Sequence, residues 1–229
     1  MKEIQPSVYW LEGRGVNLYV CVDSDGLTLV DAGMPKSEGV VLTAVSELGF
    51  QPTDLKRILI THGDLDHAGS AAAIQAATGA VVLASADTAV YLQNGRSPKH
   101  LPWLVQTLSD AFFKYKTLPA DSLQIFRAGD VLPVLGGLEV LATPGHTLDH
   151  HSLYHPSSGL LFAGDALNTR DGRLQSTPKR ITADKEAARQ SAIHLLEKKP
   201  TVFACGHGAP LADNGGKNGQ QLLLELRQS

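Results

Sequence analysis

Short apolar runs alternate with longer amphipathic segments along most of the chain. Runs of apolar or alternating positions predict β-strands, and apolar positions three or four residues apart predict helices. The first part of the chain predicts strands at 7–11, 16–22, 27–30, 57–61 and 80–84 and helices at 36–48 and 68–78. The second part predicts strands at 123–126, 138–142, 151–154, 159–163 and 201–204 and helices at 183–197 and 218–227. This interleaving predicts an α/β fold in which helices cover sheets.

A cluster of side chains that can bind metals follows the apolar run at residues 57–61. Residues 61–69 read Thr-His-Gly-Asp-Leu-Asp-His-Ala-Gly and contain His62, Asp64, Asp66 and His67. Imidazole and carboxylate are the ligands of zinc and of neighbouring first-row metals, and a strand that ends in a tight turn can point several of them at one place. The alternative interpretation of this segment alone is a solvated acidic turn with two incidental histidines.

Three more apolar runs end in a turn with a single residue of the same kind. They place His146, Asp165 and His207 after a glycine in each case. Four strand ends that deliver such residues to one edge of a sheet system favour a metal site over the solvated turn.

The order and setting of these residues resemble the metallo-β-lactamase-fold superfamily, whose signature is His-x-His-x-Asp-His followed downstream by His, Asp and His. The resemblance covers nearly the whole chain and implies an αβ/βα four-layer sandwich that forms a single domain over residues 1–229. Asp64 stands where the family usually has its second histidine. Val30-Asp31-Ala32-Gly33 resembles an early family motif, which implies that Asp31 supports the ligand loop through backbone hydrogen bonds.

The resemblance also implies a ligand set and a reaction. One metal would be held by His62, Asp64 and His146, the other by Asp66, His67 and His207, and Asp165 would bridge both, with a hydroxide between the metals. Asp66 would orient that hydroxide and carry its proton as the catalytic residue. The expected cofactors are two divalent ions, with zinc first and manganese or iron as alternatives, because the carboxylate of Asp64 adds negative charge to the first site.

The expected function is hydrolysis of a small ester, lactone or thioester. The short spacing between Asp165 and His207 and the short tail after His207 leave no room for the insertion of RNA-processing members or for a glutathione-binding tail. An alternative is a mononuclear-iron oxidoreductase resembling the persulfide dioxygenases, and a third interpretation is a metal-binding module without turnover.

Composition limits the partners and the location. The 229 residues are 43% hydrophobic and 19% charged, with a net charge of -3 and no Lys/Arg run longer than two. These values favour a small-molecule substrate over nucleic acid. No apolar run approaches a membrane span, and the first residues contain no signal-peptide core, so we expect a cytoplasmic protein. Cys21 and Cys205 are expected to be reduced, with Cys205 lining the approach to His207.

The segment from Ser85 to Pro119 is the least regular part of the chain. It carries an apolar stripe near helical spacing: Leu101, Leu104, Val105, Leu108, Phe112, Tyr115 and Leu118. Such a stripe indicates ordinary packing, with a lid or a homodimer face as the alternative. Four nearby side chains are candidate substrate contacts: Tyr91, Arg96, Lys99 and His100.

Four further histidines lie outside the motifs. One of His150 and His151 either donates a hydrogen bond to a ligand carboxylate or has a structural role. His155 and His194 are interpreted as structural.

Overall fold

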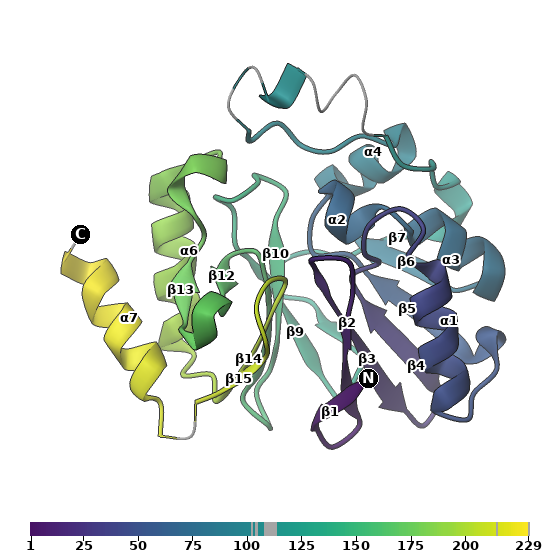
Figure 1. Ribbon diagram of the computed structural model, residues 1–229, viewed down its shortest axis with the longest axis horizontal. Helices are drawn as coiled ribbons and strands as arrows, with labels where there is room; N and C mark the ends of the chain where they lie inside the picture. The colour runs from purple at the N-terminus through teal and green to yellow at the C-terminus, as the bar shows by residue number, and fades with distance from the viewer. Residues whose placement is uncertain (102, 104, 108–113, 214, 229) are drawn as a thin grey trace.

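Two β-sheets pack face to face, and helices cover both outer faces (Figure 1). The structure is a computed structural model that describes residues 1–101, 103, 105–107, 114–213 and 215–228. Its four layers confirm the predicted α/β fold of the αβ/βα sandwich type. Within the described residues, no helix combines the length and the apolar character needed to cross a membrane.

The first sheet contains the N-terminal strands in chain order. Neighbouring strands pair antiparallel from β1 to β4 and parallel from β4 to β7. The strands are β1 (Lys2–Gln5), β2 (Val8–Glu12), β3 (Asn17–Asp23), β4 (Gly26–Val30), β5 (Leu55–Leu59), β6 (Val81–Ala84) and β7 (Leu123–Ile125). Helices α1 (Glu38–Glu47) and α3 (Ala71–Thr78) cover its outer face, on the right in Figure 1.

The second sheet has the spatial order β15-β14-β11-β10-β9-β8. Only β11 and β14 pair in parallel among these strands as described. The strands are β8 (Val131–Leu132), β9 (Leu138–Ala142), β10 (His151–His155), β11 (Leu160–Gly164), β14 (Val202–Cys205) and β15 (Leu211–Ala212). Helices α6 (Lys185–Glu197) and α7 (Lys217–Gln228) cover its outer face, on the left in Figure 1.

The remaining elements are short and lie mostly at the edges of the sandwich. Strands β12 (Leu167–Asn168) and β13 (Gln175–Ser176) form a separate pair, and helices α2 (Leu65–Ala68) and α4 (Ala86–Asn94) lie toward the upper edge in Figure 1. Single 3-10 turns occupy η1 (Pro52–Asp54), η2 (Ala120–Ser122), η3 (Arg170–Gly172) and η4 (Lys179–Ile181).

Three buried apolar clusters separate the four layers. The central cluster lies between the sheets, where the rings of Tyr19 and Phe162 meet edge to face with centroids 5.4 Å apart. The outer clusters join α1 and α3 to the first sheet and α6 and α7 to the second. Burial of apolar surface in all three clusters is the main favourable contribution to folding.

The helix predicted at 68–78 is wrong in one respect. It is interrupted, because α2 holds Asp66 and His67 in a separate turn before α3 begins after Ser70. Gly69 lies at the break, where a Cβ atom would come within 2.6 Å of the Pro35 backbone nitrogen. Gly69 thus allows the close approach of the Pro35 loop at this break, which helical periodicity does not show.

Candidate metal centre

The predicted metal-binding side chains come together at one edge of the sandwich. His62, Asp64, Asp66 and His67 follow β5, while His146 follows β9, Asp165 follows β11 and His207 follows β14. They form three overlapping groups of three; two of these groups share no residue, and the third joins Asp165 to one histidine of each, His62 and His67. The ligand roles themselves stay a prediction.

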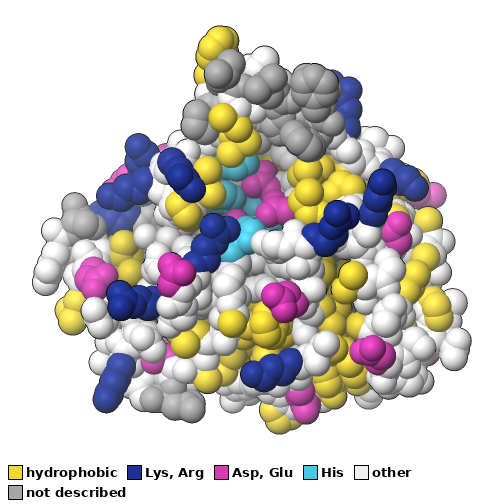
Figure 2. Space-filling model, in the orientation of Figure 1, with side chains coloured by type: hydrophobic (Ala, Val, Ile, Leu, Met, Phe, Trp, Pro, Cys, Tyr) yellow, Lys and Arg dark blue, Asp and Glu magenta, His cyan; other side chains and the backbone are white. Residues whose placement is uncertain are grey.

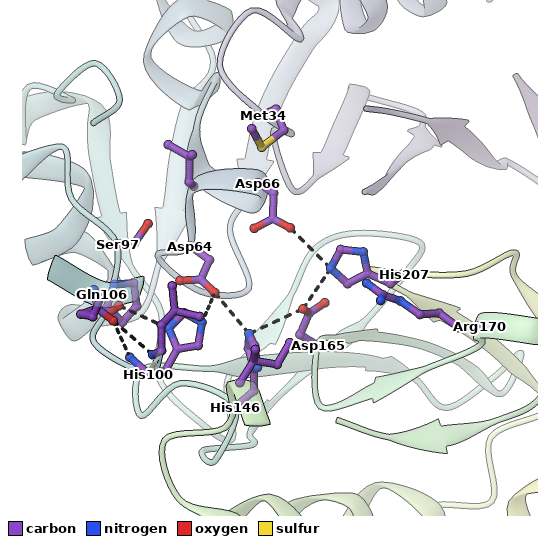
Figure 3. Close-up of a pocket in the computed structure, with 14 residues that line it drawn as sticks. Met34, Asp64, Asp66, Ser97, His100, Gln106, His146, Asp165, Arg170 and His207 are labelled. Atoms are coloured by element: carbon purple, nitrogen blue, oxygen red, sulfur yellow. Dashed lines mark hydrogen bonds and ion pairs between the residues drawn. The ribbon is translucent and has the colours of Figure 1, made fainter. Parts of the chain in front are cut away.

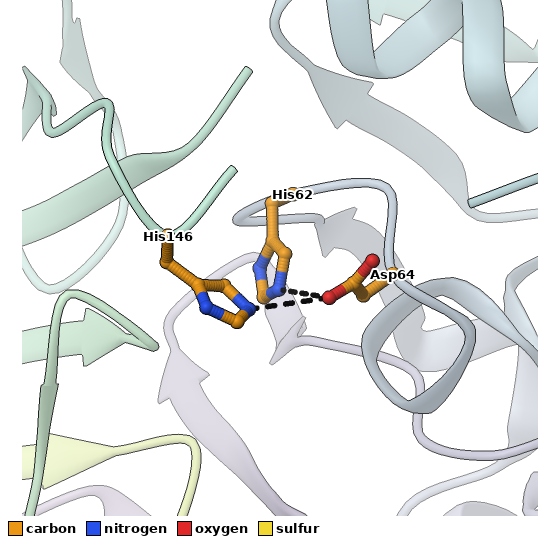
Figure 4. A group of neighbouring side chains, drawn as sticks. All are labelled: His62, Asp64 and His146. Carbon is orange, nitrogen blue, oxygen red and sulfur yellow. Dashed lines mark hydrogen bonds and ion pairs between the residues drawn. The ribbon is translucent and has the colours of Figure 1, made fainter. Parts of the chain in front are cut away.

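The first group consists of His62, Asp64 and His146 (Figure 4). Oδ2 of Asp64 lies 3.5 Å from Nε2 of His62 and 3.2 Å from Nε2 of His146. All three side chains are buried. Asp64 thus points into the cluster, as a residue that replaces an imidazole ligand would.

The second group consists of Asp66, His67 and His207. Oδ2 of Asp66 lies 3.4 Å from Nε2 of His207 and 3.9 Å from Nε2 of His67. The Asp66 side chain is 31% exposed, whereas that of His67 is fully buried. This group is therefore the one that reaches solvent.

Asp165 contacts both groups (Figure 3). Its Oδ1 is 3.2 Å from Nε2 of His67, and its Oδ2 is 3.2 Å from Nε2 of His207 and 3.6 Å from Nε2 of His146. A single carboxylate thus meets histidines of both groups, which is the placement that a bridging ligand requires.

The spacing of these atoms fits divalent cations. Two ligand atoms on one tetrahedral zinc ion lie about 3.3 Å apart, since each bond is about 2.0–2.1 Å long. The closest nitrogen–oxygen separations in the cluster are 3.2–3.6 Å. In addition, four buried atoms have no hydrogen-bond partner among the described residues: His62 Nε2, Asp64 Oδ1, His67 Nε2 and Asp165 Oδ1. Buried polar atoms are normally paired, so these unpaired atoms indicate a place where a cation binds.

The electrostatics of the cluster also favour cations. Burial raises the pKa of Asp165, but the neighbouring imidazoles of His67 and His207 outweigh burial and hold that pKa well below its usual value. Burial likewise opposes ionisation of Asp64, and the neighbouring imidazoles of His146 and His62 outweigh burial and lower its pKa. The pKa of Asp66 is lowered in the same way, against burial, by His67 and His207. All three carboxylates are therefore anionic at neutral pH.

Comparison with known proteins places the chain in a family. Residues 11–207 match the metallo-beta-lactamase superfamily. The chain belongs to this superfamily. The match includes all seven residues of the cluster, and it confirms the family that the sequence motifs resemble.

Individual proteins similar to this chain are consistent with the family match. The chain is 30% identical to YflN, a probable metallo-hydrolase of Bacillus subtilis (strain 168), over 86% of this chain and 80% of the relative. It is 29% identical to an N-acyl homoserine lactonase of a Bacillus species, over 81% of this chain and 78% of that protein. A metallo-beta-lactamase family protein from Thermus thermophilus has a similar structure, with a TM-score of 0.67, 25% identity and coverage of 99% of this chain and 81% of that one.

In this metallo-β-lactamase fold, Asp31 supports the ligand loop as predicted. Its Oδ1 accepts a hydrogen bond from the backbone N–H of Thr61 at 2.9 Å. Its Oδ2 also lies 2.8 Å from Nδ1 of His67, a contact that the sequence did not indicate. A carboxylate on Nδ1 orients the ring, so that Nε2 of His67 points toward Asp165.

Sequence reasoning missed Asp149. Its Oδ2 accepts hydrogen bonds from the backbone N–H of Gly63 and from Thr88 Oγ1, both at 2.8 Å. Asp149 is buried and thereby joins the ligand loop after β5 to helix α4. The sequence carried no signal of this role, because the partners of Asp149 are distant in sequence.

His150 contacts the backbone of Asp165, which is the structural role among the two predicted alternatives. Nε2 of His150 accepts a hydrogen bond from the backbone N–H of Asp165 at 2.9 Å, rather than donating one to the carboxylate. Burial holds the pKa of His150 well below its usual value, so the ring is neutral and its Nδ1 donates to Thr143 Oγ1 at 2.8 Å. His151 instead packs its ring on Phe126.

The backbone conformation and the packing before Asp165 both require a glycine at position 164. Gly164 has φ of 51°, and a Cβ atom there would lie 2.5 Å from Nε2 of His150. A residue with a side chain would therefore be strained and would displace His150.

A cavity of about 410 Å³ opens over the cluster (Figures 2 and 3). Among the four candidate substrate contacts, His100 lines it; the cavity lining does not include Tyr91, Arg96 or Lys99. Tyr91 packs instead against Gly63, and Arg96 and Lys99 are exposed. Arg170, which the sequence did not single out, does line the cavity.

The apolar stripe of residues 101–118 divides between two environments. Tyr115 and Leu118 are buried in the outer cluster of the first sheet, as ordinary packing predicts. Leu101 lines the cavity and Val105 is exposed. Leu104, Leu108 and Phe112 lie outside the described residues.

The prediction for Cys205 is wrong. Cys205 is fully buried in the cluster beneath α6 and α7 and is absent from the cavity lining. Cys205 is the last residue of β14, and its side chain turns into the core. Cys21 and Cys205 are both free thiols, as expected.

Substitution of Gly206 tests the packing of the cluster without changing any proposed ligand. A Cβ atom on Gly206 would overlap Asp165 Oδ1 and lie 2.5 Å from His67 Cε1. We expect Gly206→Ala to lower the affinity for at least one metal by roughly tenfold or more, because the methyl group displaces side chains that must converge. Metal equivalents after dialysis against a chelating buffer measure the effect.

The matched control is Gly39→Ala. A Cβ atom there has nothing within 4 Å, and the residue lies in α1. This variant should keep the wild-type metal content. Normal metal affinity in Gly206→Ala would contradict the packing described for the centre.

Proposed function

We propose that this protein is a metal-dependent hydrolase of a small ester, lactone or thioester. The observation that carries the proposal is the link that Asp165 makes between two His/Asp groups on the floor of a cavity. A single metal would not require a carboxylate in that place, so the arrangement favours two.

The residues divide between two cations. His62, Asp64 and His146 would hold one, Asp66, His67 and His207 the other, and Asp165 both. Two divalent cations bound there would supply Lewis acidity and lower the pKa of a shared water toward neutrality. Zinc suits the four imidazoles, whereas manganese or iron would be favoured by the three carboxylates.

Asp66 is the proposed proton carrier. Its side chain is 31% exposed, against 9% for Asp64 and 8% for Asp165, so it is the carboxylate of the cluster most open to the cavity. Its lowered pKa keeps it ionised at neutral pH, ready to accept a proton from water and pass it to a leaving group.

The cavity walls support a substrate with an apolar acyl part. Met34, Leu65, Leu101 and Ile181 line the cavity beside the charged floor. Its volume is in the range of small-molecule sites, about 300–1,000 Å³. The lactonase among the relatives supports a lactone as one of the three substrate classes.

Metal analysis with an activity screen tests the proposal. Protein purified without added metal should contain close to two equivalents per chain and hydrolyse at least one ester, lactone or thioester of a panel. Removal of the metal by chelation should lower the rate roughly 10²-fold or more, and zinc or manganese should restore it.

Two outcomes would contradict the proposal. One is a protein that binds no metal. The other is one equivalent of iron with oxygen uptake on a persulfide, which would support the oxidoreductase alternative.

A further inference from the structure

A fifth histidine reaches the cluster from the segment between α4 and β7. Nε2 of His100 lies 3.2 Å from Oδ2 of Asp64. The same oxygen is 3.2 Å from Nε2 of His146 and 3.5 Å from Nε2 of His62. Three imidazole nitrogens thus surround one carboxylate oxygen, and the His100 side chain is only 6% exposed.

The ring of His100 has the orientation of a metal ligand. Its Nδ1 lies 3.3 Å from the carbonyl oxygen of Pro98. A carbonyl can only accept, so Nδ1 carries the hydrogen and Nε2 faces Asp64. His207 has the same arrangement, with Nδ1 on the Gly15 carbonyl at 2.8 Å, and His67 has its Nδ1 on Asp31. Histidine ligands are commonly held in this way by the nitrogen that does not bind the metal.

His150 provides the contrast. Its ring centroid is 4.8 Å from that of His62, as near as the His100 ring is to His146. However, its Nε2 accepts a backbone N–H and is therefore not available to a cation. Nearness to the cluster alone therefore does not make a histidine a ligand; His100 differs from His150 because its Nε2 faces a carboxylate of the cluster.

The backbone around His100 is fixed in place. Oε1 of Gln106 accepts hydrogen bonds from the backbone N–H groups of His100 and Leu101, both at 3.1 Å. The Tyr115 hydroxyl lies 3.0 Å from the carbonyl oxygen of Gly63 and 2.9 Å from that of Arg96. These contacts connect the His100 segment to the loop that carries His62 and Asp64.

We propose that His100 is an additional protein ligand of the first metal site, together with His62, Asp64 and His146. It supplies the imidazole that position 64 does not. The first site then has three imidazoles and one carboxylate before Asp165 is counted, which resembles a closed site. Apart from the position of the shared water, open positions for substrate would lie on the second site, where Asp66 and His207 are the more exposed members.

The inference rests on the proposed metal-dependent function, and the experiment distinguishes a failure of the inference from a failure of that function. Wild type and His100→Ala are each titrated with zinc against a chromophoric chelator, and the cobalt-substituted proteins are compared by visible absorption. Lys99→Ala is the matched control, since Lys99 is the exposed neighbour in the same segment.

We expect His100→Ala to weaken one of the two zinc sites by at least tenfold, leave the other unchanged and shift the cobalt absorption bands. Added imidazole should partly restore the wild-type spectrum. Lys99→Ala should match wild type in every measurement.

Three results would overturn the inference. The first is unchanged zinc affinity and cobalt bands in His100→Ala, with or without an increase in KM, because His100 would then act on substrate or only pair with Asp64. The second is an equal loss in Lys99→Ala, which would indicate a disturbed segment. In both cases wild type still binds two metals, so the proposed function stands. The third, absence of metal from wild type, would overturn both proposals.

Discussion

Asp165→Ala should abolish most hydrolysis while the protein keeps part of its metal. Its carboxylate is the group that contacts histidines of both sites, at 3.2 Å from His67 and 3.2 Å from His207 on the second site and 3.6 Å from His146 on the first. Without it the two sites lose their link, whereas each retains its own three proposed ligands. We expect kcat to fall roughly 10³-fold, the size of loss seen when one electrostatic group is removed from an active site.

Two variants make the result interpretable. Asp165→Asn keeps the size of the side chain and removes its charge, so it should also lose activity. Asp213→Asn changes another buried aspartate, which accepts hydrogen bonds from backbone N–H groups at the start of α7 and lies outside the cluster. It should weaken α7 and leave the rate per folded molecule unchanged. A rate within tenfold of wild type in Asp165→Ala would contradict the dinuclear arrangement.

The sequence predicted the layers and the site for a common physical reason. Buried strands are apolar runs, and the polar residues just beyond their ends must lie at a sheet edge. His62, His146, Asp165 and His207 could therefore be placed together from hydrophobic patterning and the family resemblance. The glycines before Asp165 and His207 are also explained by the structure. Gly164 adopts a φ of 51°, which favours glycine, and Gly206 leaves room for the side chains of Asp165 and His67.

What the sequence did not show depends on contacts between distant residues. His100 meets Asp64 across 36 positions, and Asp149 meets Gly63 across 86. Neither lies at the end of an apolar run, so hydrophobic periodicity carries no signal of its partner. The short strands β1, β8, β12, β13 and β15 were missed because two to four residues are too few to show alternation.

Asp64→His tests whether His100 takes the place of the imidazole that the family usually has at position 64. A histidine at position 64 would restore the family motif, but its longer side chain would enter space where Nε2 of His100, His146 and His62 already lie 3.2–3.5 Å from the Asp64 carboxylate. We therefore expect the single variant to bind zinc at the first site at least tenfold more weakly than wild type.

The double variant Asp64→His with His100→Ala should recover much of that loss. Removal of the His100 ring makes room for the new imidazole, and the first site again has three histidines, now without the negative charge of Asp64. The preference for zinc over manganese should rise, because a carboxylate ligand suits manganese better than imidazole does. Zinc titration of wild type, both single variants and the double variant forms a complete cycle. If the two substitutions simply add, the His100 ring and the new imidazole do not compete for one coordination position; a coupling that restores zinc affinity shows that they do, since residues that share a contact depart from additivity.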